Sequence, residues 1–149
     1  MNAAAETPSP NESLSIGGAS IRVEIDPGEL GVARTQVFDW VRRSACAVTE
    51  YYAGFPVRKV DVKIVPIDEG KGVLFGRTVL VDQTLVIRVG LSRFATESSL
   101  RDDWVMTHEM VHLAVPSVPD ENHWIEEGIA TYVEPIARAQ VGDLSPEAV

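Results

Sequence analysis

The sequence predicts a single α+β domain in which a small mixed or antiparallel sheet packs against helices. Short segments that alternate apolar and polar residues, the pattern of half-buried strands, occupy much of residues 13–89. One long segment with helical spacing interrupts these strands, and two further helical segments follow near the end of the chain. This order differs from a regular βαβ alternation and therefore favours the α+β class.

Length and composition agree with one globular domain. The chain has 149 residues, of which 45% are apolar and 23% are charged. Its net charge of −9 would repel phosphate backbones, so we expect no nucleic-acid partner. No segment approaches the roughly 20 apolar residues of a membrane-spanning helix. No signal peptide is visible, which fits a cytoplasmic protein and equally an exported one whose signal lies outside this chain.

The first strands are expected to form a hairpin. Residues 1–12 are rich in alanine, proline and serine and are expected to be a flexible leader before one domain at 13–149. Residues 14–16 and 21–25 alternate apolar and polar positions on either side of Gly17-Gly18. A glycine pair between two such segments is typical of a tight β-turn.

A helix and several strands are expected next. Apolar residues recur with helical spacing over residues 30–53. Residues 57–65 alternate with a period of two and predict a strand. Two further strands are predicted at 79–81 and 85–89, and a glycine-bounded apolar segment at 72–76 suits an edge strand.

The last part of the chain predicts two helices. A capping box at Ser99–Asp102 favours a helix over 99–115, with Trp104 on its buried side. A second helix is expected from about 122 to 133, because Pro135 would bend or end it.

The first of these helices carries the motif His108-Glu109-Met110-Val111-His112. Two histidines four residues apart lie on the same face of a helix and can both bind one zinc ion. Glu109 then lies beside the metal, where it can act as general base toward the water that the metal activates. Composition alone predicts only about 0.003 occurrences of this pattern in the chain. The alternative is a helix with two hydrogen-bonded core histidines.

A catalytic zinc usually has three protein ligands and one open position. A cysteine ligand is not expected, because Cys46, the one cysteine of the chain, is predicted to be a small core residue of the helix at 30–53. Val115 and Val118 occupy the positions where metzincins have glycine and a third histidine, which excludes that class. The remaining candidates for the third ligand follow the motif: Asp120, Glu121, His123, Glu126 and Glu127.

The segment Trp124–Glu134, with the sequence WIEEGIATYVE, resembles the glutamate-ligand helix of gluzincins, the HExxH zinc metallopeptidases of the peptidase-MA-like group. This resemblance covers about residues 99–134. It implies a zincin-like fold, peptidase activity, Zn²⁺ as cofactor and Glu127 as the third ligand. Gly128 and Ala130 are expected to let the two helices approach closely.

Other residues near Glu127 are candidates for supporting roles. Thr131 and Glu134 follow it by four and seven residues, on its helix face, where Glu134 could accept a hydrogen bond from a liganding histidine. His123 precedes it by four residues and could act catalytically by donating to a developing oxyanion. Further candidates for that oxyanion role are Arg77, Tyr132 and Arg138.

The family's C-terminal subdomain and its G-x-M-E-N motif are not expected in this chain. The sequence therefore predicts a minimal peptidase that hydrolyses peptide bonds, and it does not distinguish an endopeptidase from an exopeptidase. The substrate would pair with the edge strand, formed by Gly72, Val73, Leu74, Phe75 and Gly76. One alternative is a non-catalytic zinc-binding or peptide-binding module with the same fold. Another is a domain in which the metal only stabilises the structure.

Overall fold

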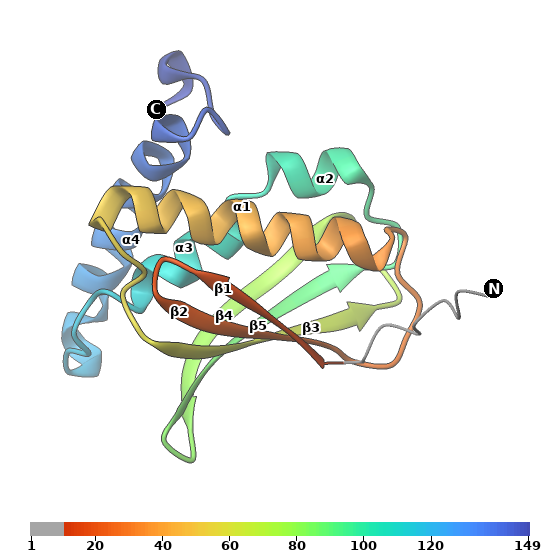
Figure 1. Ribbon diagram of the computed structural model, residues 1–149, viewed down its shortest axis with the longest axis horizontal. Helices are drawn as coiled ribbons and strands as arrows, with labels where there is room; N and C mark the ends of the chain where they lie inside the picture. The colour runs from red at the N-terminus through yellow and green to blue at the C-terminus, as the bar shows by residue number, and fades with distance from the viewer. Residues whose placement is uncertain (1–10) are drawn as a thin grey trace, which may run out of the picture.

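The computed structural model describes residues 11–149 as an α+β fold with a five-stranded mixed sheet (Figure 1). The predicted leader lies outside the described residues except for residues 11 and 12, which already belong to the first strand. The strands are β1 Asn11–Ile16, β2 Ala19–Ile25, β3 Lys59–Ile67, β4 Val73–Val81 and β5 Thr84–Ser92. The α-helices are α1 Arg34–Tyr52, α2 Glu97–Asp102, α3 Val105–His112 and α4 His123–Gln140, and the 3₁₀ helices are η1 Asp120–Asn122 and η2 Pro146–Ala148.

The sheet has the strand order β1-β2-β3-β5-β4. The pairs β1–β2 and β4–β5 are antiparallel hairpins, whereas β2–β3 and β3–β5 are parallel. The hairpin around Gly17-Gly18 is confirmed, and both glycines have positive φ (58° and 82°). Helix α1 connects the parallel strands β2 and β3, so the fold contains one βαβ unit, which the order of sequence patterns did not indicate.

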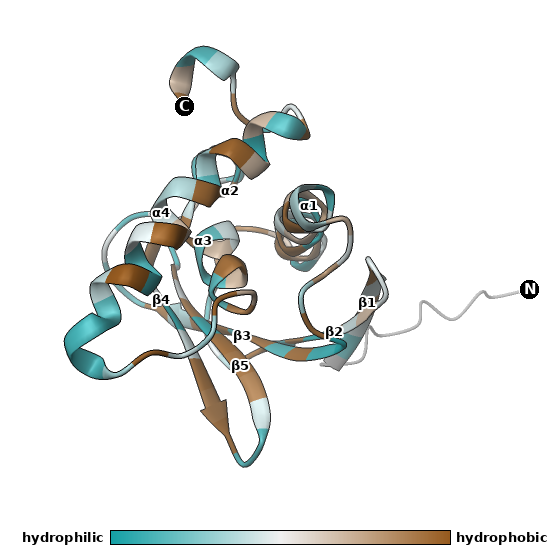
Figure 2. Cartoon of the chain, turned by 90° about the vertical axis from the view of Figure 1, so that its left-hand side faces the viewer, coloured by the Kyte–Doolittle hydropathy of each residue, from teal (hydrophilic) through white to brown (hydrophobic). Residues whose placement is uncertain are grey.

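All four α-helices lie on one face of the sheet (Figure 2). Alternate residues of the central strands point toward these helices and are fully buried, for example Ile21, Val62 and Val89. Burying each such side chain stabilises the fold by about 1.5–3 kcal/mol relative to its exposure. The opposite face of the sheet is polar in its centre, where Arg22 and Asp61 form an ion pair of 3.4 Å. The described part of the chain is thus a two-layer structure.

Helix α1 packs on the sheet through Val37, Trp40, Val41 and Val48, which are at most 1% exposed. The prediction that Cys46 is a core residue is wrong, because its side chain is exposed. Ala45 and Ala47 on either side of it are buried. Even a helix with a broad apolar face has one side that points to solvent, and Cys46 lies on that side.

Strand β4 is one continuous strand, although the sequence pattern divided it into the segments 72–76 and 79–81. The polar residues Arg77 and Thr78 separate the two apolar segments in the sequence, whereas the pairing with β5 is continuous from Phe75 to Val81. The prediction of an edge strand is confirmed, since β4 pairs with β5 on one side and ends the sheet on the other.

The predicted helix over 99–115 is in fact two helices that meet at Asp103 and Trp104. Thr96, not Ser99, is the N-cap of α2, and the Ser99 hydroxyl accepts a hydrogen bond from the backbone N–H of Thr96. Trp104 lies outside the regular turns of α3 and is 52% exposed, so its predicted burial is wrong.

Asp103 starts α3. Its carboxylate accepts hydrogen bonds of 3.0 Å from the backbone N–H groups of Val105 and Met106, which have no partner within the helix. The same carboxylate accepts a 2.9 Å hydrogen bond from Nε1 of Trp40 in α1. Asp103 therefore fixes both the beginning of α3 and its position against α1.

Asp103→Asn is expected to destabilise the protein by about 1–2 kcal/mol at pH 7, because the new amide N–H group faces N–H donors. Burial is the main cause that raises the pKa of Asp103 above its ordinary 3.8. The contribution of Asp103 to stability therefore falls as the pH rises from about 4 through this raised pKa. The free energy of unfolding, measured in urea, should accordingly differ more between parent and variant at pH 4 than at pH 7. An unchanged free energy at both pH values would contradict this role.

Helix α4 continues past Pro135 to Gln140, instead of ending near Val133 as predicted. Pro135 cannot donate a hydrogen bond to the carbonyl of Thr131, but Thr131 is exposed and water can serve this carbonyl. The turn after the proline is held by tertiary contacts, since Ala137 is fully buried. Arg138, 5% exposed, forms a 2.8 Å ion pair with Glu134. No helix within residues 11–149 is both long and apolar enough to cross a membrane.

Candidate metal centre

His108 and His112 lie one turn apart on α3. On the neighbouring face of this helix, Met106 and Met110 are fully buried in the core and hold α3 against the sheet. The two imidazoles lie on another face, toward Glu127 of α4, and their Nε2 atoms are 3.3 Å apart. His108 is 6% exposed, which leaves it little contact with water.

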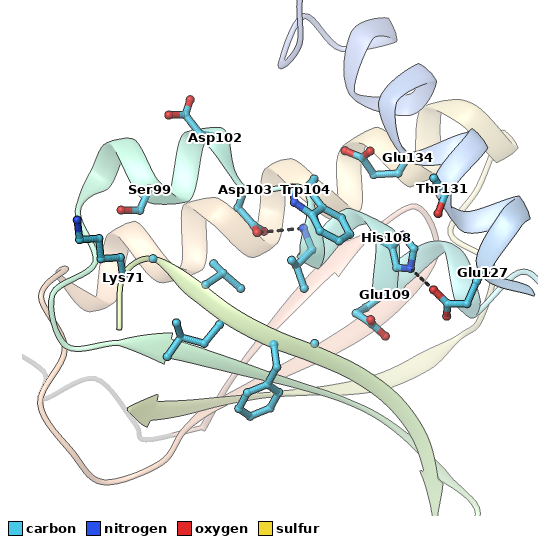
Figure 3. A pocket seen from close by; sticks show the side chains of 16 residues that line it. Lys71, Ser99, Asp102, Asp103, Trp104, His108, Glu109, Glu127, Thr131 and Glu134 are labelled. Carbon is cyan, nitrogen blue, oxygen red and sulfur yellow. Dashed lines mark hydrogen bonds and ion pairs between the residues drawn. The ribbon is translucent and has the colours of Figure 1, made fainter. Parts of the chain in front are cut away.

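Glu127 reaches this pair from the second turn of α4. Figure 3 shows its carboxylate beside the ring of His108. Its Oε2 lies 3.2 Å from Nε2 of His108, and its Oε1 lies 3.0 Å from Nε2 of His112. Among the described residues, no other group of His, Cys, Asp or Glu side chains lies close enough together to bind a metal ion. The structure thus brings together the three residues predicted as metal ligands.

The spacing of these atoms fits a zinc ion. Ligands at about 2.0–2.1 Å from a tetrahedral zinc lie about 3.3–3.4 Å from one another. The observed separations of 3.0–3.3 Å, measured to Oε2 of Glu127 for His108 and to Oε1 for His112, are close to this value. Where neither of these imidazole nitrogens carries a proton, their lone pairs face each other and repel. A cation between them would serve both nitrogens and the carboxylate.

The other candidates for the third ligand do not join this cluster. Glu126 points to the preceding loop, where its Oε1 accepts a 2.7 Å hydrogen bond from the backbone N–H of Val118. This hydrogen bond is the main cause that lowers the pKa of Glu126 below its ordinary value, and the contact with His123 lowers it further. Asp120 and Glu121 are exposed in η1.

Of the four candidates for stabilising an oxyanion, His123 is nearest to the metal centre. Its Nε2 lies 3.5 Å from Oε1 of Glu127, and its Nδ1 lies 3.0 Å from Oε2 of Glu126. Arg138 is occupied by ion pairs with carboxylates, and Tyr132 is 68% exposed on α4.

Arg77 does not face the metal centre. It pairs with Arg88 in β5, one residue away from the pair formed by Thr78 and buried Ile87. Successive side chains of a strand point to opposite faces, so Arg77 lies on the face of the sheet without helices.

Two predicted supporting residues have other surroundings than expected. Glu134 is 8% exposed and pairs with Arg138, and no hydrogen bond between the described residues joins it to His108 or His112. Thr131 is exposed on the rim of the cleft.

The expectation that Gly128 allows close helix packing is wrong, because a Cβ atom there would meet nothing within 4 Å. Ala130, in contrast, is fully buried.

Glu109 lies between the metal centre and the edge strand β4 and is 8% exposed. Its Oε2 accepts a 2.7 Å hydrogen bond from the hydroxyl of Thr78 in β4.

The sequence patterns indicated neither Thr78 nor Asp103 as a functional residue. An aspartate just before a helical segment is a common N-cap and could have revealed Asp103. Thr78 has no comparable signal, because its contact depends on how the strand is placed.

A cleft runs between β4 and the helices, and Glu109, Glu127 and Gly76 line it on both sides of the metal centre. The part toward the start of β4 has a volume of about 850 Å³, and the part toward its end has about 660 Å³. The larger part is bordered by exposed Trp104, whose ring meets the His108 ring edge to face at 5.4 Å. Its charged lining residues are one lysine and five acids: Lys71, Asp102, Asp103, Glu109, Glu127 and Glu134.

Gly76 lets β4 approach α3 closely. A Cβ atom at this position would lie 2.4 Å from Cγ1 of Val105 and 2.8 Å from Cγ of Glu109. Both contacts are far shorter than real carbon contacts, so any side chain at position 76 requires the strand and the helix to separate.

Gly76→Ala is therefore expected to destabilise the protein by about 1–3 kcal/mol, the usual cost of overpacking. Gly128→Ala is the matched control, since the added methyl group meets open space and alanine stabilises a helix relative to glycine by about 0.5–1 kcal/mol. Urea unfolding of both variants should give shifts of opposite sign. A Gly76→Ala protein as stable as the parent would contradict the close approach of β4 and α3.

No known protein family matches the sequence, and no curated protein is significantly similar to it.

Proposed function

We propose that this protein is a zinc-dependent metallopeptidase with a zincin-like fold of the gluzincin type. His108, His112 and Glu127 are its zinc ligands, and Glu109 is its general base. The observation that carries the proposal is the convergence of two imidazole nitrogens and one carboxylate at separations of 3.0–3.3 Å. No fourth His, Cys, Asp or Glu of the described residues completes this cluster, which supports an open catalytic site over a closed structural one.

A bound zinc ion would polarise the scissile carbonyl and make water acidic enough to lose a proton near neutral pH. The chain's own residues supply the remaining chemistry. Glu109 accepts a proton from the attacking water and then passes it to the nitrogen of the leaving amine. His123 is the nearest candidate for binding the oxyanion, since its Nδ1 is engaged with Glu126 and its Nε2 faces Glu127 at the metal centre.

The substrate class follows from the edge strand. Gly72 and residues 73–76 of β4 line the larger part of the cleft, and an edge strand offers backbone N–H and C=O groups to an extended peptide. The cleft extends to both sides of the metal centre, so a chain could continue in both directions from the bond to be cleaved. The acidic lining favours a cation at this site and disfavours strongly anionic substrates.

Two measurements on purified protein test this function. We expect about one zinc ion per chain, and cleavage of a mixed peptide pool that stops with a chelator and returns with zinc. Protein that binds zinc but cleaves no peptide would instead be a zinc-binding or peptide-binding module. Protein that binds no zinc would overturn the metal centre itself.

A further inference from the structure

We propose that Thr78 is a positioning residue that holds the carboxylate of Glu109 in one orientation. Thr78 belongs to the edge strand β4, whereas Glu109 belongs to α3, so the contact joins the two walls of the cleft. The effect of Thr78 on catalysis rests on the proposed function of Glu109. The hydrogen bond itself does not depend on that function and can be tested separately.

Both hydrogen-bond acceptors near the Thr78 hydroxyl belong to Glu109. The hydroxyl oxygen lies 2.7 Å from Oε2 of Glu109 and 3.0 Å from its backbone carbonyl oxygen. A hydroxyl group has one proton, and in either direction this proton is donated to the same residue. The distance of 2.7 Å is typical of an O–H···O hydrogen bond, and such a bond is stronger to an ionised carboxylate than to a neutral group.

Gly76 leaves space for the other carboxylate oxygen. Oε1 of Glu109 lies 3.2 Å from the point where a Cβ atom of Gly76 would be. Gly76 and Thr78 are two residues apart and so lie on the same face of β4. One of them thus leaves space for the Glu109 side chain, and the other binds its Oε2. Oε1, which is not bonded to Thr78, is then the oxygen that can accept the proton from water.

This arrangement fits what a general base requires. A glutamate side chain has three torsions, and a small error in its position reduces the rate strongly, by about 100-fold per Å in sensitive cases. Burial removes the water that would otherwise solvate Oε2, and the Thr78 hydroxyl replaces it. The substrate peptide is proposed to pair with the same strand. Strand β4 would therefore position both the general base and the peptide backbone.

Thr78→Val removes the hydroxyl and keeps the shape of the side chain. We expect kcat to fall about tenfold, while KM changes less than about twofold and the zinc content does not change. Thr78→Ser keeps the hydroxyl and should restore most of kcat. Thr84→Val makes the same change at an exposed position of the neighbouring strand and should have no effect on kcat. An unchanged kcat in Thr78→Val, or an equal loss in Thr78→Ser, would overturn the proposal.

A second experiment needs no activity. Thr78→Val is made in the parent and in Glu109→Met, which removes the carboxylate and keeps the length of the side chain. We expect Thr78→Val to lower the urea midpoint of the parent, and to lower that of the Glu109→Met protein less than half as much, because the carboxylate acceptor is already gone there. Equal shifts in both backgrounds would overturn the hydrogen bond. If zinc-loaded parent protein cleaves no peptide while the shifts differ, the proposed function fails and the contact between Thr78 and Glu109 is supported.

Discussion

Glu109→Gln protein is expected to keep its zinc and to lose hydrolysis by about 100- to 10,000-fold, the usual contribution of general acid–base catalysis. The amide has nearly the same shape as the carboxylate, and its oxygen can still accept the hydrogen bond from Thr78. It cannot accept a proton from water at neutral pH. The loss should therefore appear in kcat, while the metal ligands remain unchanged.

The measurement is peptide cleavage by zinc-loaded parent and variant at equal metal content. Glu50→Gln makes the same chemical change at an exposed position of α1 and should cleave at the parent's rate. A Glu109→Gln variant that cleaves as fast as the parent would show that Glu109 is not the base. Loss of zinc from this variant would also contradict the assignment, because it would make Glu109 part of the metal-binding set.

The candidate metal centre could be predicted from the sequence because most of it depends on local geometry. Residues four apart in a helix share a face, so the spacing of His108 and His112 already determines that the imidazoles meet. The third ligand was different, since Glu126 and Glu127 are adjacent and the sequence alone does not determine which of them α4 turns toward the histidines. The resemblance to the gluzincin helix selected Glu127, and the structure brings this residue to both histidines.

The fold could be predicted where alternation and glycine turns specify strands, as in the hairpin at Gly17-Gly18. Prediction failed where tertiary contacts override a local signal. Pro135 does not end α4, because Ala137 and Arg138 are buried beyond it. The break before α3 was missed because the residues on both sides of Asp103 continue the helical pattern.

Contacts between distant segments could not be predicted where no motif connects them. Thr78 meets Glu109, 31 residues further along the chain, only because β4 lies at the edge of the sheet and α3 packs against it. The sequence patterns identified β4 in two pieces, with Thr78 between them. Without the register of the strand, nothing distinguished this threonine from an exposed one.

The two adjacent glutamates of α4 give the sharpest test of the metal centre. Glu127→Ala removes a carboxylate from within 3.2 Å of both imidazoles and is expected to weaken zinc binding by more than about 100-fold. Glu126→Ala removes an equal charge one residue earlier and should leave zinc affinity within a few-fold of the parent. His112→Ala should lose both zinc and hydrolysis, because one imidazole and one carboxylate cannot hold the ion at an open site.

Zinc affinity is measured by competition with a chromogenic chelator, so the result does not depend on finding a substrate. The comparison separates local coordination from overall charge, since Glu126→Ala and Glu127→Ala change the net charge equally. Equal weakening by both variants would indicate that the acidic cleft attracts zinc without a defined third ligand. A Glu127→Ala protein with the parent's affinity would remove Glu127 from the centre, and with it the basis for a gluzincin-type site.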